Sequence, residues 1–260
     1  TPPAGLPRIL DGERVSGFVT ELPSNPLLRS ADLPSLSELA RAQDGLVVVD
    51  DTAGTPVNVE ITPYADLIAV SLTKYMSGRG DVLGGALLVS PRSPHGERLR
   101  DRLAREHEEL LWWSDAVVLE ERSRDFVDRM RRTNKNAEAL SERLRAHPRI
   151  EQIYYPKFDP GGGYDKVRRR DGGYGGLLSI LVRDAPTRAP VVYDNLRVSK
   201  GPNLGTAYTL ACPYTILAHY GELDWAESCG VSRWLIRVSV GLENIEDLWS
   251  RFEDALAAAG

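Results

Sequence analysis

The sequence predicts an α/β fold, and two apolar runs together with the helical patterns around them carry that prediction. Residues 46–49 form a continuous run rich in β-branched side chains, which is typical of a parallel strand buried on both faces. Residues 67–70 form a second short apolar run, which predicts another buried strand. Segments with apolar residues at helical spacing, such as 119–145, alternate with these runs. This alternation is typical of sheets covered by helices.

Length and composition limit the possible functions. At 260 residues, the chain can form one large domain or two modest ones. It carries 32 Lys and Arg against 37 Asp and Glu, and no basic stripe indicates a nucleic-acid partner. No apolar run is long enough to cross a bilayer and no signal peptide opens the chain, so we expect a cytoplasmic protein without a membrane partner.

The cysteines and histidines indicate neither disulfides nor a metal site. Cys212 and Cys229 give no disulfide framework and no metal-ligand spacing. The four histidines are scattered along the chain. We therefore expect free thiols in a reducing cytoplasm and no bound metal.

The first part of the chain is predicted to consist of short strands and helices separated by turns. The Pro- and Asn-containing segment 23–26 ends the first strand, and Asp32 lies near the start of the first helix. Trp112 and Trp113 are expected to pack at a domain or subunit contact. The predicted elements are strands at 17–22, 46–49, 67–70 and 86–90, and helices at 32–42 and 97–111.

The second part opens with one long amphipathic helix at 119–145, which His147 and Pro148 end. The glycine-rich segments around the basic run 166–170 favour a mobile, solvated loop over 161–176. The other predicted elements are strands at 150–156, 177–182 and 234–243, and a final helix at 245–259.

The stretch that follows the strand 67–70 carries the most specific chemistry. Ser71 and Thr73 lie at positions i and i+2, which point to the same side of an extended backbone, and two hydroxyl donors suit a phosphate. Lys74 follows, and a desolvated lysine can bond covalently to an aldehyde carbon. These residue types describe a seat for pyridoxal 5′-phosphate (PLP). Taken alone, an ordinary strand end with a solvated lysine explains them equally well.

The longer string Ser-x-Thr-Lys-Tyr-x-x-Gly-x-x-Asp-Val-x-Gly-Gly at residues 71–85 resembles the cofactor-lysine segment of the Cys/Met-metabolism PLP enzymes, the cystathionine γ-synthase family. The resemblance extends from about Gly17 to the end of the chain. It implies the PLP-dependent transferase fold, similar to aspartate aminotransferase, with the strand 86–90 antiparallel. It also implies the C-terminal half of the large mixed-sheet domain at 1–118, a bridging helix at 119–146, and a small α/β C-terminal substrate domain at 147–260.

The resemblance also implies roles for single residues. Lys74 is the catalytic lysine that holds PLP, and Ser71 and Thr73 are the phosphate ligands. Asn25 matches an asparagine near the PLP ring hydroxyl. Asp50, in Val-Asp-Asp-Thr-x-x-Thr-Pro, matches the carboxylate that keeps the pyridine nitrogen protonated.

Arg237 projects from the otherwise apolar strand 234–243, and a buried arginine needs an anion. The resemblance makes that anion the substrate α-carboxylate, whereas an internal salt bridge is the structural alternative. Asn203 lies in a loop that borders the substrate in the family, where it replaces a serine, and Tyr208 replaces a glutamate. These two departures put ordinary cystathionine chemistry in question. Lys200 in the same loop either binds a substrate acid or is solvated.

The family's catalytic chain is longer than this sequence and has an N-terminal half for which residues 1–46 offer no substitute. The four predicted strands before residue 118 would then leave an unpaired apolar sheet edge, and such edges aggregate unless they are covered. We therefore expect a split enzyme, in which a second polypeptide supplies the N-terminal half. The expected assembly is a hetero-oligomer with dimer or tetramer symmetry like that of the family.

The predicted function is PLP-dependent γ-replacement on an O-activated homoserine-type amino acid, a trans-sulfuration reaction of amino-acid metabolism. A PLP-dependent β- or γ-lyase acting on a sulfur amino acid is the first alternative, because a fold does not separate replacement from elimination. A non-catalytic scaffold subunit that retains the fold is the second.

Overall fold

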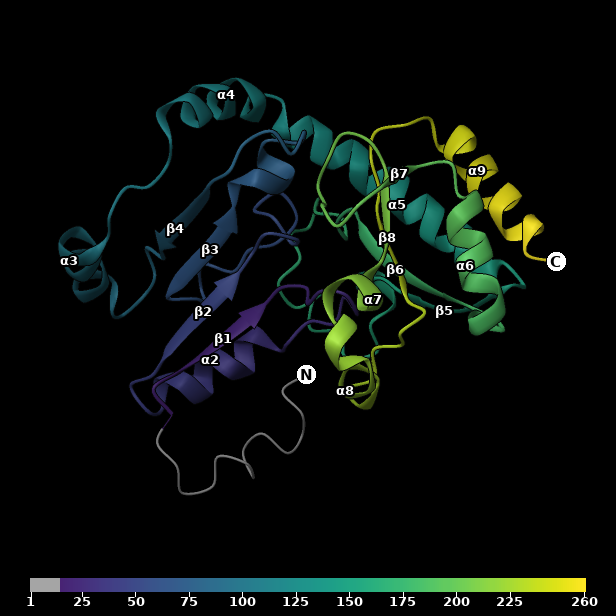
Figure 1. Cartoon of the computed structure of the whole chain (residues 1–260). Helices are drawn as coiled ribbons and strands as arrows, with labels where there is room; N and C mark the ends of the chain where they lie inside the picture. Colours follow the sequence, from purple (N-terminus) through teal and green to yellow (C-terminus); the bar gives the residue numbers. More distant parts are fainter. Residues whose placement is uncertain (1–14) are drawn as a thin grey trace.

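Two β-sheets form the framework of the computed structural model, which describes residues 15–260 (Figure 1). The first sheet has the strand order β1-β2-β3-β4, and the second has the order β5-β6-β9-β8-β7. The α/β prediction is confirmed. The first fourteen residues of the predicted segment 1–118 lie outside the described residues.

The first sheet is mixed. Strands β1 and β2 are parallel, as are β2 and β3, whereas β3 and β4 are antiparallel. All four predicted strands of this region, including the antiparallel one, are therefore confirmed. Their bounds are β1 (Gly17–Glu21), β2 (Leu46–Asp50), β3 (Leu67–Ser71) and β4 (Gly85–Val89).

One helix covers this sheet on one side. Helix α2 (Leu33–Arg41) begins after Asp32, whose carboxylate accepts a hydrogen bond from the Ser35 amide at 3.3 Å. Leu33 and Leu36 of this helix pack with Val47 and Val49 of β2 in one buried cluster. The outer strands are less well covered: Val19 in β1 is 82% exposed, and Leu87 and Leu88 in β4 are 43% and 48% exposed.

The segment between the two sheets differs from the prediction. The predicted helix 97–111 ends early, as α3 (Gly96–Glu106), and the predicted helix 119–145 is two helices, α4 (Trp113–Ser123) and α5 (Phe126–Ala146). The break falls at Arg124 and Asp125, where the backbone of Asp125 leaves helical geometry and a new helix starts at the buried Phe126. Aspartate is more favourable at helix starts than in helix interiors. The spacing of the apolar residues, on which the prediction of one helix rested, does not reveal this break.

Trp112 and Trp113 are largely exposed among the described residues. Their exposed fractions are 63% and 70%, so the predicted domain contact is wrong within residues 15–260. The alternative, a contact between subunits, stays a prediction.

The second sheet consists of β5 (Ile150–Tyr154), β6 (Leu177–Val182), β7 (Ser199–Lys200), β8 (Leu210–Pro213) and β9 (Ile236–Ser239). The three inner strands of this sheet are almost wholly buried, whereas its edge strands β5 and β7 carry exposed residues. Strands β6 and β9 are antiparallel neighbours at its centre.

Helices α5, α6 (Ala185–Asn195) and α9 (Ile245–Ala258) pack on one side of the second sheet (Figure 1). The remaining short elements are α7 (Tyr214–Ala218), α8 (Leu223–Ser228) and the turns η2 (Pro156–Phe158) and η3 (Tyr220–Glu222).

The segment 161–176 is packed, so the prediction of a mobile solvated loop is wrong. Tyr164 and Val167 are 1% and 3% exposed and belong to the buried cluster of the first sheet. The charged side chains between the glycines form ion pairs: Lys166 contacts Asp32, and Arg169 lies 2.7 Å from Glu60. Glycine content and charge predicted exposure here, but aromatic anchors and ion pairs hold the segment down.

Polar side chains on the far face of the second sheet join the two regions. In β9, Ile236 and Val238 belong to the core beneath the helices, so Arg237 and Ser239 face the opposite way. Ser179 of β6 donates to the Pro26 carbonyl in the turn after β1 at 2.8 Å.

No helix among residues 15–260 combines the length and the apolar character that a membrane span requires.

Candidate active site

The carboxyl ends of the parallel strands of the first sheet bring four predicted site residues to one edge. Asp50 is the last residue of β2, Ser71 is the last residue of β3, and Asn25 lies in the turn after β1. Lys74 follows Ser71 in η1 (Leu72–Met76), a π-type helical turn. In open α/β sheets ligands bind outside the carboxyl ends of strands, so this edge is the expected place for a site.

The two predicted phosphate ligands do not lie on one extended strand. Strand β3 ends at Ser71, and Thr73 lies inside the helical turn η1. The spacing argument for these hydroxyls is therefore wrong, although both residues line the same cavity. The Thr73 hydroxyl accepts a hydrogen bond from the Gly84 amide at 3.0 Å and also lies 3.3 Å from the Gly84 carbonyl.

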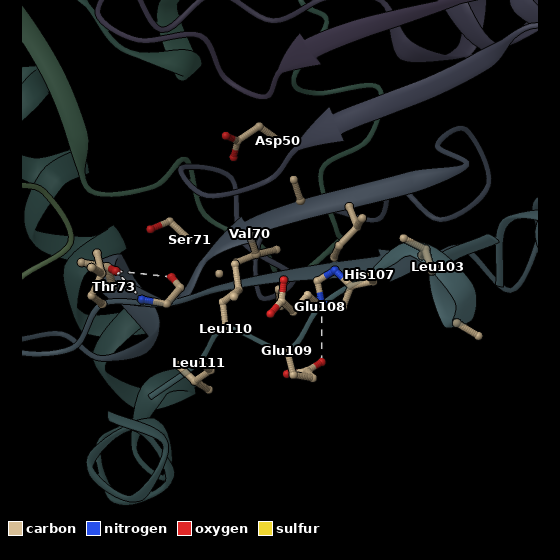
Figure 2. Close-up of a pocket in the computed structure, with 17 residues that line it drawn as sticks. Asp50, Val70, Ser71, Thr73, Leu103, His107, Glu108, Glu109, Leu110 and Leu111 are labelled. Carbon is tan, nitrogen blue, oxygen red and sulfur yellow. Dashed lines mark hydrogen bonds and ion pairs between the residues drawn. The ribbon is translucent and has the colours of Figure 1, made fainter. Parts of the chain in front are cut away.

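A cavity of about 1100 Å³ lies against this edge. Asp50, Ser71 and Thr73 line it together with Val70, and residues 107–111 of the α3–α4 connection lie across from the sheet (Figure 2). The Asp50 carboxylate also accepts a hydrogen bond from the Thr52 amide at 2.9 Å. An acid and two hydroxyls thus face one space that can hold a small anionic ligand.

Lys74 is held by a residue from the second region. Its Nζ donates to Oδ1 of Asn203 at 2.6 Å. Burial lowers the pKa of the Lys74 amine, and the nearby positive charge of Arg237 lowers it further. A lysine with a lowered pKa is more often neutral, which is the form that acts as nucleophile or base.

Arg237 is 4% exposed and has no carboxylate partner among the described residues. Its Nη2 donates to the carbonyls of Pro202 and Asn203 at 2.5 and 3.1 Å, and Nε is buried without a hydrogen-bond partner. The internal salt bridge that we considered is therefore not formed in residues 15–260. A buried guanidinium without a carboxylate partner can still accept an anion.

Asn25 and Tyr214 complete the surroundings of Arg237. Nη1 of Arg237 donates to Oδ1 of Asn25 at 3.3 Å, and the guanidinium carbon lies 5.1 Å from the centre of the Tyr214 ring. Nδ2 of Asn25 lies 3.5 Å from the Tyr214 hydroxyl. Asn25 and Asn203 thus both contact Arg237, and Asn203 joins this group to Lys74.

Sequence reasoning missed two residues and left one open. Tyr214 gave no signal, because an aromatic residue at a helix start is common. Thr52 was passed over, although its hydroxyl accepts from the Ser71 amide at 2.8 Å and so ties the ends of β2 and β3. The sequence left the role of Lys200 open between binding a substrate acid and being solvated. Its Nζ lies 4.1 Å from the centre of the Tyr193 ring and donates to the Tyr193 carbonyl.

A family model described as "Cys/Met metabolism PLP-dependent enzyme" matches residues 10–257. The chain belongs to this family. Its resemblance to the cystathionine γ-synthase group, inferred above from motifs, is thereby confirmed.

Members of this family include relatives that are similar along nearly the whole chain. Cystathionine gamma-synthase of Neurospora crassa is 44% identical over 253 residues, which are 97% of this chain and 41% of that relative. The chain therefore spans less than half the length of this relative.

Solved structures of the family confirm the PLP-dependent transferase fold. Cystathionine gamma synthase from Xanthomonas oryzae pv. oryzae, in complex with cystathionine, has a TM-score of 0.81 at 28% identity, covering 94% of this chain and 63% of that one. The cystathione gamma lyase CalE6 from Micromonospora echinospora has a TM-score of 0.81 at 26% identity, covering 93% and 64%.

Proposed function

We propose that this chain is part of a PLP-dependent enzyme that carries out γ-replacement on an O-activated homoserine-type amino acid. The observation that carries the proposal is that Asn203 joins Lys74 to Arg237. The side chain of Asn203 accepts a hydrogen bond from Lys74, and its backbone carbonyl accepts one from Arg237. One amine and one unpaired guanidinium at a single site are what an amino-acid substrate and an aldehyde cofactor require. The similarity to a cystathionine gamma-synthase supports the reaction class.

The residues present fit PLP. Lys74 supplies an amine of lowered pKa for the aldehyde, and Asp50 supplies a carboxylate for the pyridine nitrogen. Ser71 and Thr73 supply hydroxyls for the phosphate at the cavity that Asp50 also lines; Lys74 lies next to Thr73 in the sequence but does not itself line that cavity. When bound, PLP supplies an electron sink for the substrate's α-carbon, which permits loss of a γ-substituent and addition of a nucleophile.

Each of the candidate site residues then has a defined role in the reaction. Arg237 binds the substrate α-carboxylate through its fork of N–H donors, and Asn25 orients that guanidinium. Lys74 Nζ takes up the α-proton as a general base. Asn203 gives up its contact with Lys74 and borders the substrate. We further propose the domain division 1–118, 119–146 and 147–260, with α5 as the bridging helix.

The cofactor assignment is tested by trapping. The intact assembly is incubated with PLP, reduced with borohydride, digested and weighed, and the peptide that contains Lys74 is expected to gain the mass of the reduced cofactor. Lys74→Ala should lose the adduct and lower the turnover number at least about 100-fold, because it removes both the attachment point and the base. Lys135→Ala, an exposed lysine of α5, should change neither. An unaltered mass of the Lys74 peptide in the wild-type protein would contradict the proposal.

A PLP-dependent β- or γ-lyase acting on a sulfur amino acid is the alternative, and similarity to a gamma lyase at the same TM-score favours it equally. Product analysis separates the two reactions. Replacement joins an added thiol to the substrate carbon chain, whereas elimination releases ammonia and a 2-oxo acid whether or not a thiol is present. A scaffold subunit would give the same activity of the assembly with Lys74 and with Ala at this position.

We also propose that the active assembly includes a second polypeptide that covers the first sheet and makes it a hetero-oligomer. The exposed Val19, Leu87 and Leu88 on the outer strands support such a cover, because exposed apolar strand edges favour pairing. Native mass spectrometry of the purified protein tests this proposal. A stable, active species of 28.7 kDa alone would contradict it. The cytoplasm is the proposed location.

A further inference from the structure

An arginine outside the site grips the backbone that carries Lys74. Arg129 lies in the first turns of α5, and its side chain is 14% exposed. Its guanidinium donates to the carbonyls of Tyr75 and Met76, each at 2.9 Å. These are the two residues that directly follow Lys74 in the turn η1.

The remaining donors of Arg129 fix the guanidinium itself. Nη2 also donates to the Arg122 carbonyl at 2.9 Å, and Nε forms an ion pair with Asp125 at 2.7 Å. Arg122 lies in the last turn of α4, and Asp125 lies at the break between α4 and α5. A planar fork with five donors can make all of these contacts at once, whereas a lysine ammonium cannot reproduce their geometry.

Two glycines leave the space that the contacts around this turn require. Gly78 has φ +74°, and a β-carbon there would collide with Nη1 of Arg129. On the other side of the turn, a β-carbon at Gly205 would lie 2.5 Å from the Tyr75 amide nitrogen. Gly205 belongs to the loop that presents Asn203 to Lys74. The backbone after Lys74 is thus held between this loop and Arg129.

The turn η1 needs an external support. Within it, Lys74 departs from helical geometry, with φ −87° and ψ −121°. Its own closing hydrogen bonds run from the Ser77 amide to the Leu72 carbonyl at 3.0 Å and from the Gly78 amide to the Lys74 carbonyl at 2.9 Å. The carbonyls of Tyr75 and Met76 depend on Arg129, so loss of the guanidinium leaves them without these partners.

We propose that Arg129 is a positioning residue, which aims Lys74 at Asn203 and at the bound cofactor by clamping the carbonyls of Tyr75 and Met76. Its catalytic meaning rests on the proposed function, but the clamp itself does not. Without the clamp, the turn opens, Lys74 loses its contact with Asn203, and its amine becomes more hydrated. The amine pKa then rises towards that of an ordinary lysine, because burial is the main cause of its present lowering.

The clamp can be measured without cofactor. The full-length chain is labelled with an amine-acetylating reagent over a range of pH, and the rate of modification of Lys74 is followed by peptide mass spectrometry. We expect Arg129→Met to lower this rate about three- to tenfold at pH values below the pKa of Lys74, since a raised pKa leaves a smaller fraction of the amine uncharged. Arg129→Lys should give a smaller decrease. Arg132→Met, an exposed neighbour on α5, should give none.

Two results would overturn the proposal. One is an unchanged Lys74 profile in a folded Arg129→Met protein, and the other is a wild-type Lys74 that already titrates like a free lysine. If Arg129→Met does not fold, Gly78→Ala provides the same test, because it displaces the guanidinium without removing its charge. An unchanged profile in that variant also overturns the clamp. Borohydride trapping of PLP on the wild-type protein fails only if the proposed function is wrong, so the two hypotheses fail separately.

Discussion

The two sheets of this protein are completed in different ways. In the second sheet, the residues of β6 and β9 are almost all buried, and three helices cover one side. In the first sheet, helix α2 covers one side, while the antiparallel strand β4 keeps large apolar side chains exposed. Parallel strands are normally covered on both faces. The second sheet therefore has its own core, whereas the first sheet keeps apolar side chains exposed among the described residues.

The two sheets also divide the chemistry. The first contributes Asp50, Ser71 and Lys74 from strand ends, and the second contributes Arg237 from the middle of a buried strand. A carboxylate-binding arginine needs a rigid, dehydrated frame, whereas a cofactor-binding edge needs an open cavity. In the proposed function, the first sheet provides the cofactor side of the site and the second sheet provides the substrate side.

The largest expected effect is a difference in the stability lost when one leucine is truncated in each of the two sheets. Leu178→Ala in β6 removes a side chain that is 0% exposed, and we expect it to lower the free energy of unfolding by about 2–5 kcal/mol. The matched change Leu88→Ala in β4 removes one that is 48% exposed, and it should cost less than about 1 kcal/mol. Urea denaturation of the full chain measures both. Equal losses would mean that the first sheet is as complete as the second.

The second prediction concerns a buried acid of the first region. Asp51 is 3% exposed, and burial raises the pKa of its carboxyl well above the ordinary value. The folded state therefore keeps this proton to higher pH than the unfolded state does, so stability falls as pH rises from the ordinary value of 3.8 towards the raised pKa. Asp51→Asn should remove that fall and be more stable than the wild type at about pH 8, by less than the loss in Leu178→Ala.

Unfolding free energies at several pH values check this prediction, with the exposed Asp171→Asn as control. The difference between Asp51→Asn and the wild type should grow with pH, and Asp171→Asn should follow the wild-type curve. A constant difference would show that Asp51 does not titrate differently in the folded state.

The smallest effect lies where the two regions touch. Asn25 accepts a hydrogen bond from Arg237 at 3.3 Å, which is long for such a contact. A double-mutant cycle with Asn25→Ala and Arg237→Met should give a coupling of about 1 kcal/mol in the free energy of unfolding. The pair Asn25→Ala and Arg132→Met, which are not in contact, should be additive. Additivity in the first pair as well would mean that this contact does not join the two regions.

Local features determined most of the elements. The apolar runs at 46–49 and 67–70 became β2 and β3 because short β-branched stretches bounded by polar residues have few other stable environments. Asp32 and Asn244 mark helix starts through their side-chain caps. The break at Asp125 and the early end of α3 were not predicted, since the apolar period that was used to place these helices does not mark where a helix ends.

The sequence by itself determined the family and the places of the four strands of the first sheet, and it predicted the candidate reactive groups, because these depend on residue types at short spacing. Only the tertiary structure decided what surrounds them. It brought Asn203 and Arg237 to Lys74, packed the glycine-rich segment 161–176 against the first sheet, and placed Arg129 behind the lysine turn. Contacts between residues more than fifty positions apart leave no periodic signal in the chain, because they form only when two separately folded surfaces meet.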